Sequence, residues 1–572
     1  MGHVRETRPP VVRTPAGALR GTAAGPAGGD APVHAFLGVP FMAPPVGPLR
    51  FASPRPVRPW TGTRPAAVLP PAFLQPGGPG PVGAPAPAPV SAEHAVQANV
   101  WTPDVHGSRP VLVYVHGGGW RAGSASSPTF DGARLAARGD LVVVTFNHRL
   151  GPFGYGRHEQ LADPDTGLCA NWGLQDQAAL VEWVRSAIAA FGGDPENITL
   201  CGTSAGGAAV WQLALLPGLR GVVRRLVLIS AAHLWAPAYA LEPDDARTAL
   251  DVLADRLGVG VAGLRTVDAD KLLAAWEDCF SGAPDHRPVA SGRCYRGPVQ
   301  DGELVPGPDV HRPVPDLPTL TVTTDTEGSF YTAGALPHPV DDTELRGMVH
   351  AHLLQGRADV PEQLADLAVG HYRARAREEG RAGDAVSLYA EIVGDSLFRH
   401  QIVRLTERGA VESKAPRYVL HFDHVVRPPS FGTPHEATAP FMFGTHGIPW
   451  HREIFGDGPV ERQVSQTFMD LVSSFARDGV PRSEAVPCWP AFTVGDPRVL
   501  CLGGPAGPRI TALPKAAQLE FWDTAGWHPA PDARSGPGRG AGARGPRPRG
   551  RPPATPPHRR PGGGAAPAPP PP

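Results

Sequence analysis

Short apolar runs, each bounded by glycine or polar residues, recur through the first half of the chain. Four of them are 110–115 (PVLVYV), 141–146 (LVVVTF), 198–202 (ITLCG) and 226–230 (LVLIS). Because they lack the polar alternation of a half-exposed strand, they are typical of strands buried on both faces. Residues 173–191 lie between two of these runs, and their apolar side chains recur at helical spacing. The alternation predicts an α/β fold with a central, mostly parallel sheet covered by helices on both faces.

A late amphipathic segment and two segments rich in proline and glycine complete the pattern. Residues 459–479 are predicted to form a helix that closes the domain, and residues 70–90 to form an exposed loop. Residues 529–572 hold 24 Gly or Pro among 44 positions, with eight Arg against one Asp. This segment has no aromatic side chain and no aliphatic one larger than alanine, so it cannot bury enough apolar surface to offset its ordering entropy. We expect one domain over 10–528 and a disordered tail over 529–572.

Composition excludes several classes of protein. The 572 residues carry a formal net charge of −1, which gives no electrostatic case for a nucleic-acid partner. The apolar runs are far shorter than the about 20 residues that span a bilayer, and the first twenty residues lack the apolar core of a secretory signal. The six cysteines have no metal-ligand spacing, which favours reduced thiols. We therefore expect a soluble cytoplasmic protein with neither a membrane nor a nucleic-acid partner.

Two glycine-rich motifs directly follow predicted strands. HGGGW (116–120) follows the run at 110–115, and GTSAG (202–206) follows the run at 198–202 and precedes a helical stretch. A Gly-x-Ser-x-Gly turn between a strand and a helix forces its serine into a strained elbow that exposes the hydroxyl. The glycines of the first motif let backbone amides approach a substrate oxygen, as in an oxyanion hole. Together the motifs predict acyl-transfer chemistry at Ser204.

Further blocks follow in the order found in one known family. They are FLGVPFMAPPVGPLRF (36–51), VYVHGGGW (113–120), FNHRLGPFGY (146–155), NWGLQDQAALVEWV (171–184), FGGDPENITLCGTSAGG (191–207), TDTEGSF (324–330) and GTPHEATAPFMFG (432–444). With these blocks the chain resembles the type-B carboxylesterases, the cholinesterase-like branch of the α/β-hydrolase fold. The resemblance covers roughly residues 10–525. It implies one catalytic domain instead of the several that the length alone would suggest.

The resemblance also implies a role for each catalytic group. Ser204 corresponds to the nucleophile, Glu327 in TDTEG to the acid and His435 in the GTPH block to the base, in the order nucleophile, acid, histidine. The oxyanion hole corresponds to the backbone amides of Gly118, Gly119 and Ala205. The family requires no metal and no organic cofactor, and its substrates are small-molecule esters.

Two of these assignments have rivals nearby in the sequence. Asp325 lies two residues before Glu327, which is favoured because it directly precedes a glycine. His421, His424 and His446 lie near His435. The first two alternate with apolar residues as in a strand, whereas His435 lies in a Gly/Thr/Pro loop, where binding and catalytic residues are common. The triad Ser204, Glu327 and His435 is therefore the preferred one.

Three aromatic residues are candidates for the substrate pocket by the same resemblance. Trp120 follows the oxyanion glycines, and Phe330 and Tyr331 lie just beyond Glu327. The alternative for each is a place in the hydrophobic core. Two ion pairs are expected in the scaffold, also by analogy with the family: Arg50 with Glu93 and Arg149 with Asp176.

The sequence departs from the family pattern at three positions. Thr203 stands where a glutamate commonly precedes the nucleophile, Ala95 where the family has a disulfide cysteine, and Thr438 where an acidic residue often follows the histidine. The predicted function is hydrolysis of neutral carboxylic esters through an acyl-enzyme. Two alternatives remain open: hydrolysis of amides, carbamates or lactones by the same triad, and a non-catalytic binding protein on this fold.

Overall fold

The computed structural model describes residues 9–24, 32–77, 91–231, 242–280, 297–307, 312–332, 340–354, 360–361, 363–381, 383–428 and 430–527. The predicted tail at 529–572, residues 78–90 of the predicted loop, Cys294 and the side chain of Tyr331 lie outside this description. No helix within it is long and apolar enough to cross a membrane. The cysteines that it includes are free thiols, as expected: Cys169, Cys201, Cys279, Cys488 and Cys501.

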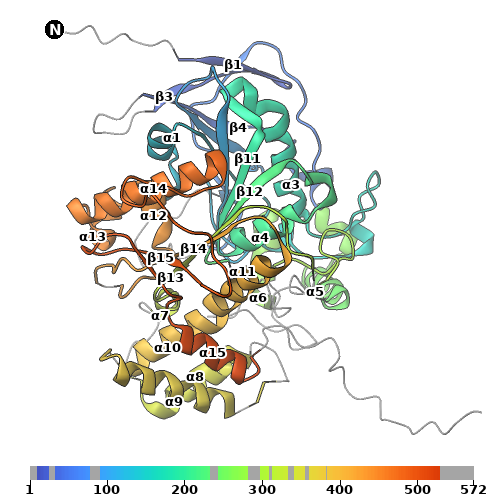
Figure 1. Cartoon of the computed structure of the whole chain (residues 1–572). Helices are drawn as coiled ribbons and strands as arrows, with labels where there is room; N and C mark the ends of the chain where they lie inside the picture. Colours follow the sequence, from blue (N-terminus) through green and yellow to red (C-terminus); the bar gives the residue numbers. More distant parts are fainter. Residues whose placement is uncertain are drawn as a thin grey trace, which may run out of the picture. The chain divides into compact units, whose positions relative to one another are not determined.

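The described residues form an 11-stranded sheet in the order β16-β15-β14-β13-β12-β11-β9-β10-β8-β4-β3 (Figure 1). The strands are β3 (Thr22–Ala24), β4 (Val33–Val39), β8 (Ala98–Thr102), β9 (Arg109–Val115), β10 (Val142–Phe146), β11 (Gly193–Thr203), β12 (Val223–Ile229), β13 (Thr319–Thr324), β14 (Arg417–Phe422), β15 (Val499–Leu502) and β16 (Arg509–Thr511). From β10 to β15 all neighbours run parallel, and the outer pairs are antiparallel. The loops that leave the carboxyl ends of the parallel strands therefore gather along one edge of the sheet.

Two smaller sheets flank the main one. β1 (Val11–Thr14), β2 (Gly17–Arg20) and β5 (Thr63–Pro65) form the first, and β6 (Ala72–Phe73) pairs with β7 (Ser91–Ala92) in the second. The helices are α1 (Ala133–Gly139), α2 (Gly151–Gly154), α3 (Trp172–Ala187), α4 (Ala205–Ala214), α5 (Pro243–Arg256), α6 (Ala269–Phe280), α7 (Ser329–Thr332), α8 (Asp342–Leu354), α9 (Gln363–Glu378), α10 (Ala385–Gly394), α11 (His400–Glu412), α12 (Thr438–Met442), α13 (Arg452–Phe455), α14 (Pro459–Asp478) and α15 (Ala516–Thr524). A π-helical turn, η9 (Asp395–Arg399), joins α10 to α11.

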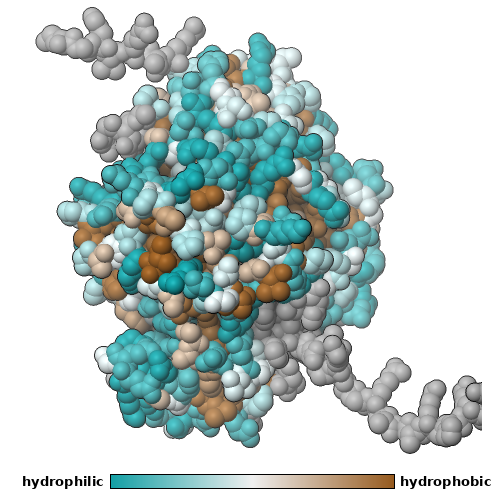
Figure 2. Space-filling view, in the orientation of Figure 1, coloured by the Kyte–Doolittle hydropathy of each residue, from teal (hydrophilic) through white to brown (hydrophobic). Residues whose placement is uncertain are grey.

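Both faces of the sheet are buried because successive side chains of a strand point to opposite sides. In β9, Val111, Val113 and Val115 belong to the core that α3 and α4 cover. Leu112 and Tyr114 belong to the other core, which α1 and α14 cover. A further apolar cluster joins α8, α9, α10 and α15, the group of helices below the sheet in Figure 1. On the face drawn in Figure 2, hydrophobic residues form small areas scattered among hydrophilic ones.

Most of the predicted elements are confirmed, with shifted ends. The runs at 110–115, 141–146, 198–202 and 226–230 correspond to β9, β10, β11 and β12, and residues 173–191 to α3 and the short turn after it. The helix expected at 459–479 is α14. The prediction of an exposed loop over 70–90 was wrong at its start, because Ala72, Phe73 and Leu74 are buried. The Phe73 ring packs on Phe153, 5.9 Å between centroids, so a single aromatic residue anchors a proline-rich segment in the core.

Candidate active site

Ser204 lies in a sharp turn between β11 and α4. Its backbone has φ 58° and ψ −125°, a conformation that residues other than glycine seldom adopt. Two hydrogen bonds hold the turn: the amide of Ser204 donates to the carbonyl of Ile229 (2.9 Å), and its carbonyl accepts from Ala208 (3.1 Å). Glycines are required on both sides, because a Cβ on Gly202 would overlap the carbonyl of Gly206. The motif therefore adopts the strained turn between a strand and a helix that was predicted for it.

The loop after β9 brings backbone amides to the same edge of the sheet. Gly118 and Gly119 have φ values of 121° and 61°, in the left-handed region that favours glycine. In the part of the chain that the structure describes, the amides of Gly118, Gly119 and Ala205 donate to no protein acceptor. Ala205 is the first residue of α4, so its N–H adds to the positive end of the helix dipole. These three donors can stabilise an oxyanion that forms at Ser204.

A stacked pair of histidines lies behind this loop. The rings of His116 and His148 are 4.8 Å apart between centroids and nearly parallel. Burial lowers the pKa of His116 to about 4 and the pKa of His148 well below its ordinary value. At neutral pH both rings are therefore uncharged, and Nδ1–H of His116 donates to the carbonyl of Gly117 (2.9 Å). The pair supports the glycine loop through packing and one hydrogen bond, without a charge.

Glu327 and His435 form a short hydrogen bond. Nδ1 of His435 lies 2.6 Å from Oε2 of Glu327, and both side chains are buried. A carboxylate accepts only, so Nδ1 carries the proton and Nε2 of the neutral ring keeps a free lone pair. Nε2 has no hydrogen-bond partner among the described residues. The amide of His435 also donates to the carbonyl of Glu327 (3.3 Å), which fixes the two residues to each other a second time.

The other oxygen of Glu327 is held by two further donors. Ser230 Oγ–H and the amide of Thr324 both donate to Oε1, at 2.7 and 2.8 Å. Ser230, whose hydroxyl holds the Glu327 carboxylate, was not singled out from the sequence. The available signal was its position, directly after the buried strand that neighbours the nucleophile strand. The glycine after the acid has a steric cause as well, since a Cβ on Gly328 would overlap the carbonyl of Ala390 in α10.

The rival residues have other partners. Oδ1 of Asp325 accepts from His421 Nε2 at 3.2 Å and lies 3.5 Å from the ammonium of Lys515. Burial disfavours ionisation of Asp325, but Lys515 and His421 outweigh it and hold the pKa of this carboxyl well below its usual range. His424 Nδ1 accepts from an amide at 3.3 Å, and His446 lies 3.8 Å from Asp457. None of these contacts involves Glu327.

The pocket candidates occupy different environments. Trp120 is buried in the core that α3 and α4 cover, and its carbonyl accepts from Gly151 (2.8 Å). Phe330, in α7, is half-buried, and its ring centroid lies 6.2 Å from that of His435. Phe398, in the turn η9, lies closer to the imidazole, at 4.1 Å, and was not singled out from the sequence. The backbone of Tyr331 continues α7, and its side chain is not described.

Comparison with known proteins gives the same picture over nearly the whole chain. A model of the carboxylesterase family matches residues 8–522. The chain belongs to the carboxylesterase family. Phenmedipham hydrolase of Pseudarthrobacter oxydans is 32% identical over 508 residues, which cover 86% of this chain and 95% of that protein. Acylcarnitine hydrolase of Mus musculus is 30% identical over 550 residues, 90% of each. A solved structure of PNB esterase superposes with a TM-score of 0.69 at 27% identity, covering 90% of this chain and all of that one.

Family and fold together identify the protein as a carboxylic ester hydrolase with the α/β-hydrolase fold. Both expected scaffold pairs of this carboxylesterase are present. The side chains of Arg149 and Asp176 are almost completely buried and form two hydrogen bonds with each other, at 2.6 and 2.8 Å. Arg50 and Glu93 also pair through two bonds, one of them 2.7 Å long. Because removal of either partner would leave a buried charge uncompensated, these pairs are scaffold features.

The position before the nucleophile is polar but uncharged in this carboxylesterase. The hydroxyl of Thr203 accepts from Tyr114 OH at 3.0 Å. Glu436, directly after His435, is a second carboxyl group near the candidate site, and it was not singled out from the sequence. Burial raises the pKa of Glu436 to about 7, against the opposing effect of His435, and the charge of Glu436 also acts on the Tyr114 phenol. A carboxyl group that ionises near neutral pH therefore directly follows His435 and acts electrostatically on the phenol that donates to Thr203.

Proposed function

We propose that this carboxylesterase hydrolyses neutral carboxylic esters through an acyl-enzyme on Ser204. His435 is the general base and then the general acid. Glu327 holds the imidazole in the required tautomer and stabilises the imidazolium. The amides of Gly118, Gly119 and Ala205 form the oxyanion hole.

The reaction has two symmetrical halves. Nε2 of His435 takes the proton of Ser204 Oγ as this oxygen attacks the ester carbonyl, and the carbonyl oxygen becomes the tetrahedral oxyanion. The imidazolium then protonates the leaving alcohol, and the acyl group stays on Ser204. A water molecule gives its proton to Nε2, attacks the acyl carbon, and releases the carboxylic acid while the proton returns to Ser204.

The observation that carries the proposal is the hydrogen bond between Glu327 and His435. It assigns the proton to Nδ1 and leaves the lone pair of Nε2 unbonded within the described residues. The strained backbone at Ser204 adds support, because such conformations persist where function requires them. Thr203 places no carboxylate directly before Ser204, which favours neutral over cationic substrates.

A panel of p-nitrophenyl esters with acyl chains of increasing length tests the proposal. Ser204→Ala should lower kcat by about 10⁴-fold or more, because the covalent route is lost. Ser186→Ala, the same substitution at a serine whose hydroxyl only bonds the carbonyl of Trp183, is the matched control and should keep full activity. Turnover by Ser204→Ala close to that of the wild type would refute the assignment.

A further inference from the structure

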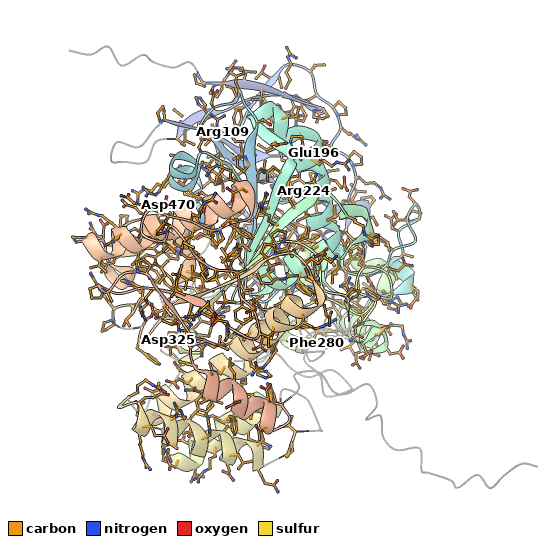
Figure 3. All side chains as sticks on the ribbon, viewed as in Figure 1. Arg109, Glu196, Arg224, Phe280, Asp325 and Asp470 are labelled. Atoms are coloured by element: carbon orange, nitrogen blue, oxygen red, sulfur yellow. The ribbon has the colours of Figure 1, made fainter. Side chains whose placement is uncertain are left out.

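The turn that carries Glu327 is held by two cations from distant parts of the chain. We define the acid turn as residues 324–328 (TDTEG), where Asp325 is labelled in Figure 3. Its backbone carbonyls face basic side chains. Arg399 Nη2 donates to the carbonyls of Thr324 and Asp325, each at 2.6 Å. Lys515 Nζ donates to the carbonyl of Asp325, also at 2.6 Å.

Arg399 is itself fixed by a buried chain of hydrogen bonds. Its guanidinium pairs with Asp395 one turn earlier, and both side chains are almost completely buried. Asp395 accepts from Tyr372 OH (2.7 Å), and the Tyr372 hydroxyl accepts from Trp522 Nε1 (2.8 Å). The chain thus links α15 to the acid turn through the π-helical turn η9. Single π-helical turns of this kind are frequent at functional sites.

The backbone that carries Lys515 is held in place as well. It precedes α15 with φ 54° and ψ 32°, a left-handed conformation that is uncommon for a lysine. Asp523 in α15 bonds to His400 at 2.8 Å and also pairs with Arg404, so the helix is anchored to α11. The Lys515 side chain is 11% exposed, and its ammonium lies close to the Asp325 carboxylate as well as to the Asp325 carbonyl. A strained backbone on an anchored helix thus directs one cation at the acid turn.

We propose that Lys515, together with Arg399, is a positioning residue for catalysis that fixes the acid turn so that Glu327 keeps its geometry to His435. The inference rests on the proposed role of Glu327. The Glu327 carboxylate cannot move independently of its surroundings, because Ser230, the Thr324 amide and His435 all form hydrogen bonds with it. A shift of the Thr324–Asp325 backbone would therefore move the carboxylate relative to the imidazole. Even a small displacement of a catalytic group lowers the catalytic rate strongly, whereas the contacts that bind the substrate stay the same.

Lys515→Met tests the role without disturbing the more deeply buried Arg399. We expect kcat to fall about 10-fold with KM nearly unchanged. Lys515→Arg, which keeps the charge and the donors, should stay within about threefold of the wild type. Lys414→Met, which removes an exposed lysine elsewhere, is the matched control and should have no effect. Thermal unfolding and titration with a fluorophosphonate give the concentration of folded, competent enzyme, so that kcat refers to it alone.

A double-mutant cycle separates positioning of Glu327 from a general structural effect. If Lys515 acts through Glu327, Lys515→Met should cost less than about twofold in the Glu327→Gln background. An unchanged kcat in the single variant, or an equal loss in both backgrounds, would overturn the proposal. Failure of Glu327→Gln itself to lower activity would instead refute the triad assignment. Should Lys515→Met not fold, Lys515→Gln takes its place in the same cycle, with the same deciding outcomes.

Discussion

The two halves of the proposed catalytic site are built in different ways. On the nucleophile side, backbone conformation carries the geometry: Ser204, Gly118 and Gly119 all have positive φ values, and amides supply the charge stabilisation. On the acid–base side, side chains carry it: Ser230, Arg399 and Lys515 reach the acid turn from three separate elements. A local motif can therefore encode one half of such a site, whereas the other half depends on contacts between distant parts of the fold.

The two halves also respond to different kinds of change. The backbone half should be intolerant of added atoms, because its glycines lie against neighbouring carbonyls. The side-chain half should be intolerant of lost hydrogen bonds but indifferent to nearby groups with other partners. Each of the following substitutions tests one side of this contrast.

The largest expected effect is on the acid–base side. Glu327→Gln should lower kcat/KM by about 10⁴-fold, because an amide at this position favours the wrong imidazole tautomer. Asp325→Asn should cost less than about fivefold, since its carbonyl still accepts from Lys515 and Arg399 and its carboxylate does not touch His435. Steady-state hydrolysis of p-nitrophenyl acetate measures both. A greater loss in Asp325→Asn than in Glu327→Gln would mean that Asp325, and not Glu327, is the acid of the triad.

A smaller loss is expected when the backbone of the nucleophile side is crowded at Gly206. A Cβ on Gly206 would overlap the carbonyl of Val115 at the end of β9, which would push the elbow away from the oxyanion loop. Gly206→Ala should therefore lower kcat by about 10²-fold. Gly218→Ala is the matched control, because nothing lies within 4 Å of its added Cβ. Full activity in Gly206→Ala would mean that the backbone on the nucleophile side accommodates an added Cβ in spite of the close contact.

The smallest effect concerns Glu436, which directly follows His435. The folded chain holds its carboxyl proton up to a pKa of about 7, whereas the unfolded chain releases it near the ordinary value of 4.5. The folded state therefore loses stability as pH rises through this window. We compare the free energy of unfolding of Glu436→Gln with that of the wild type at each pH. The difference should shift in favour of the variant by on the order of 2 kcal/mol from pH 5 to pH 8. Denaturant titrations at both pH values measure the gain, and exposed Glu453→Gln should show none.

What the sequence could predict follows the same division. The buried strands (though not their exact ends), the turn at Ser204 and the glycine loop lie within short segments, so apolar periodicity and glycine placement were sufficient to predict them. Lys515 acts on Asp325 across 190 residues and Arg399 acts across 74, and no local pattern marks either contact. Phe73 shows the same limit, because proline-rich composition concealed one buried anchor. Glu436 acquires its raised pKa from burial, which only the assembled fold supplies.

The central claim is that Ser204 is the one nucleophile of a carboxylesterase, and covalent labelling tests it most directly. The full chain is treated with a fluorophosphonate, and intact mass gives the number of adducts while peptide fragmentation gives their position. The account predicts a single adduct on Ser204, abolished in Ser204→Ala and formed more slowly in Glu327→Gln, because the base is then in the wrong tautomer. Failure to form an adduct, or a stoichiometric adduct on another side chain, would contradict it.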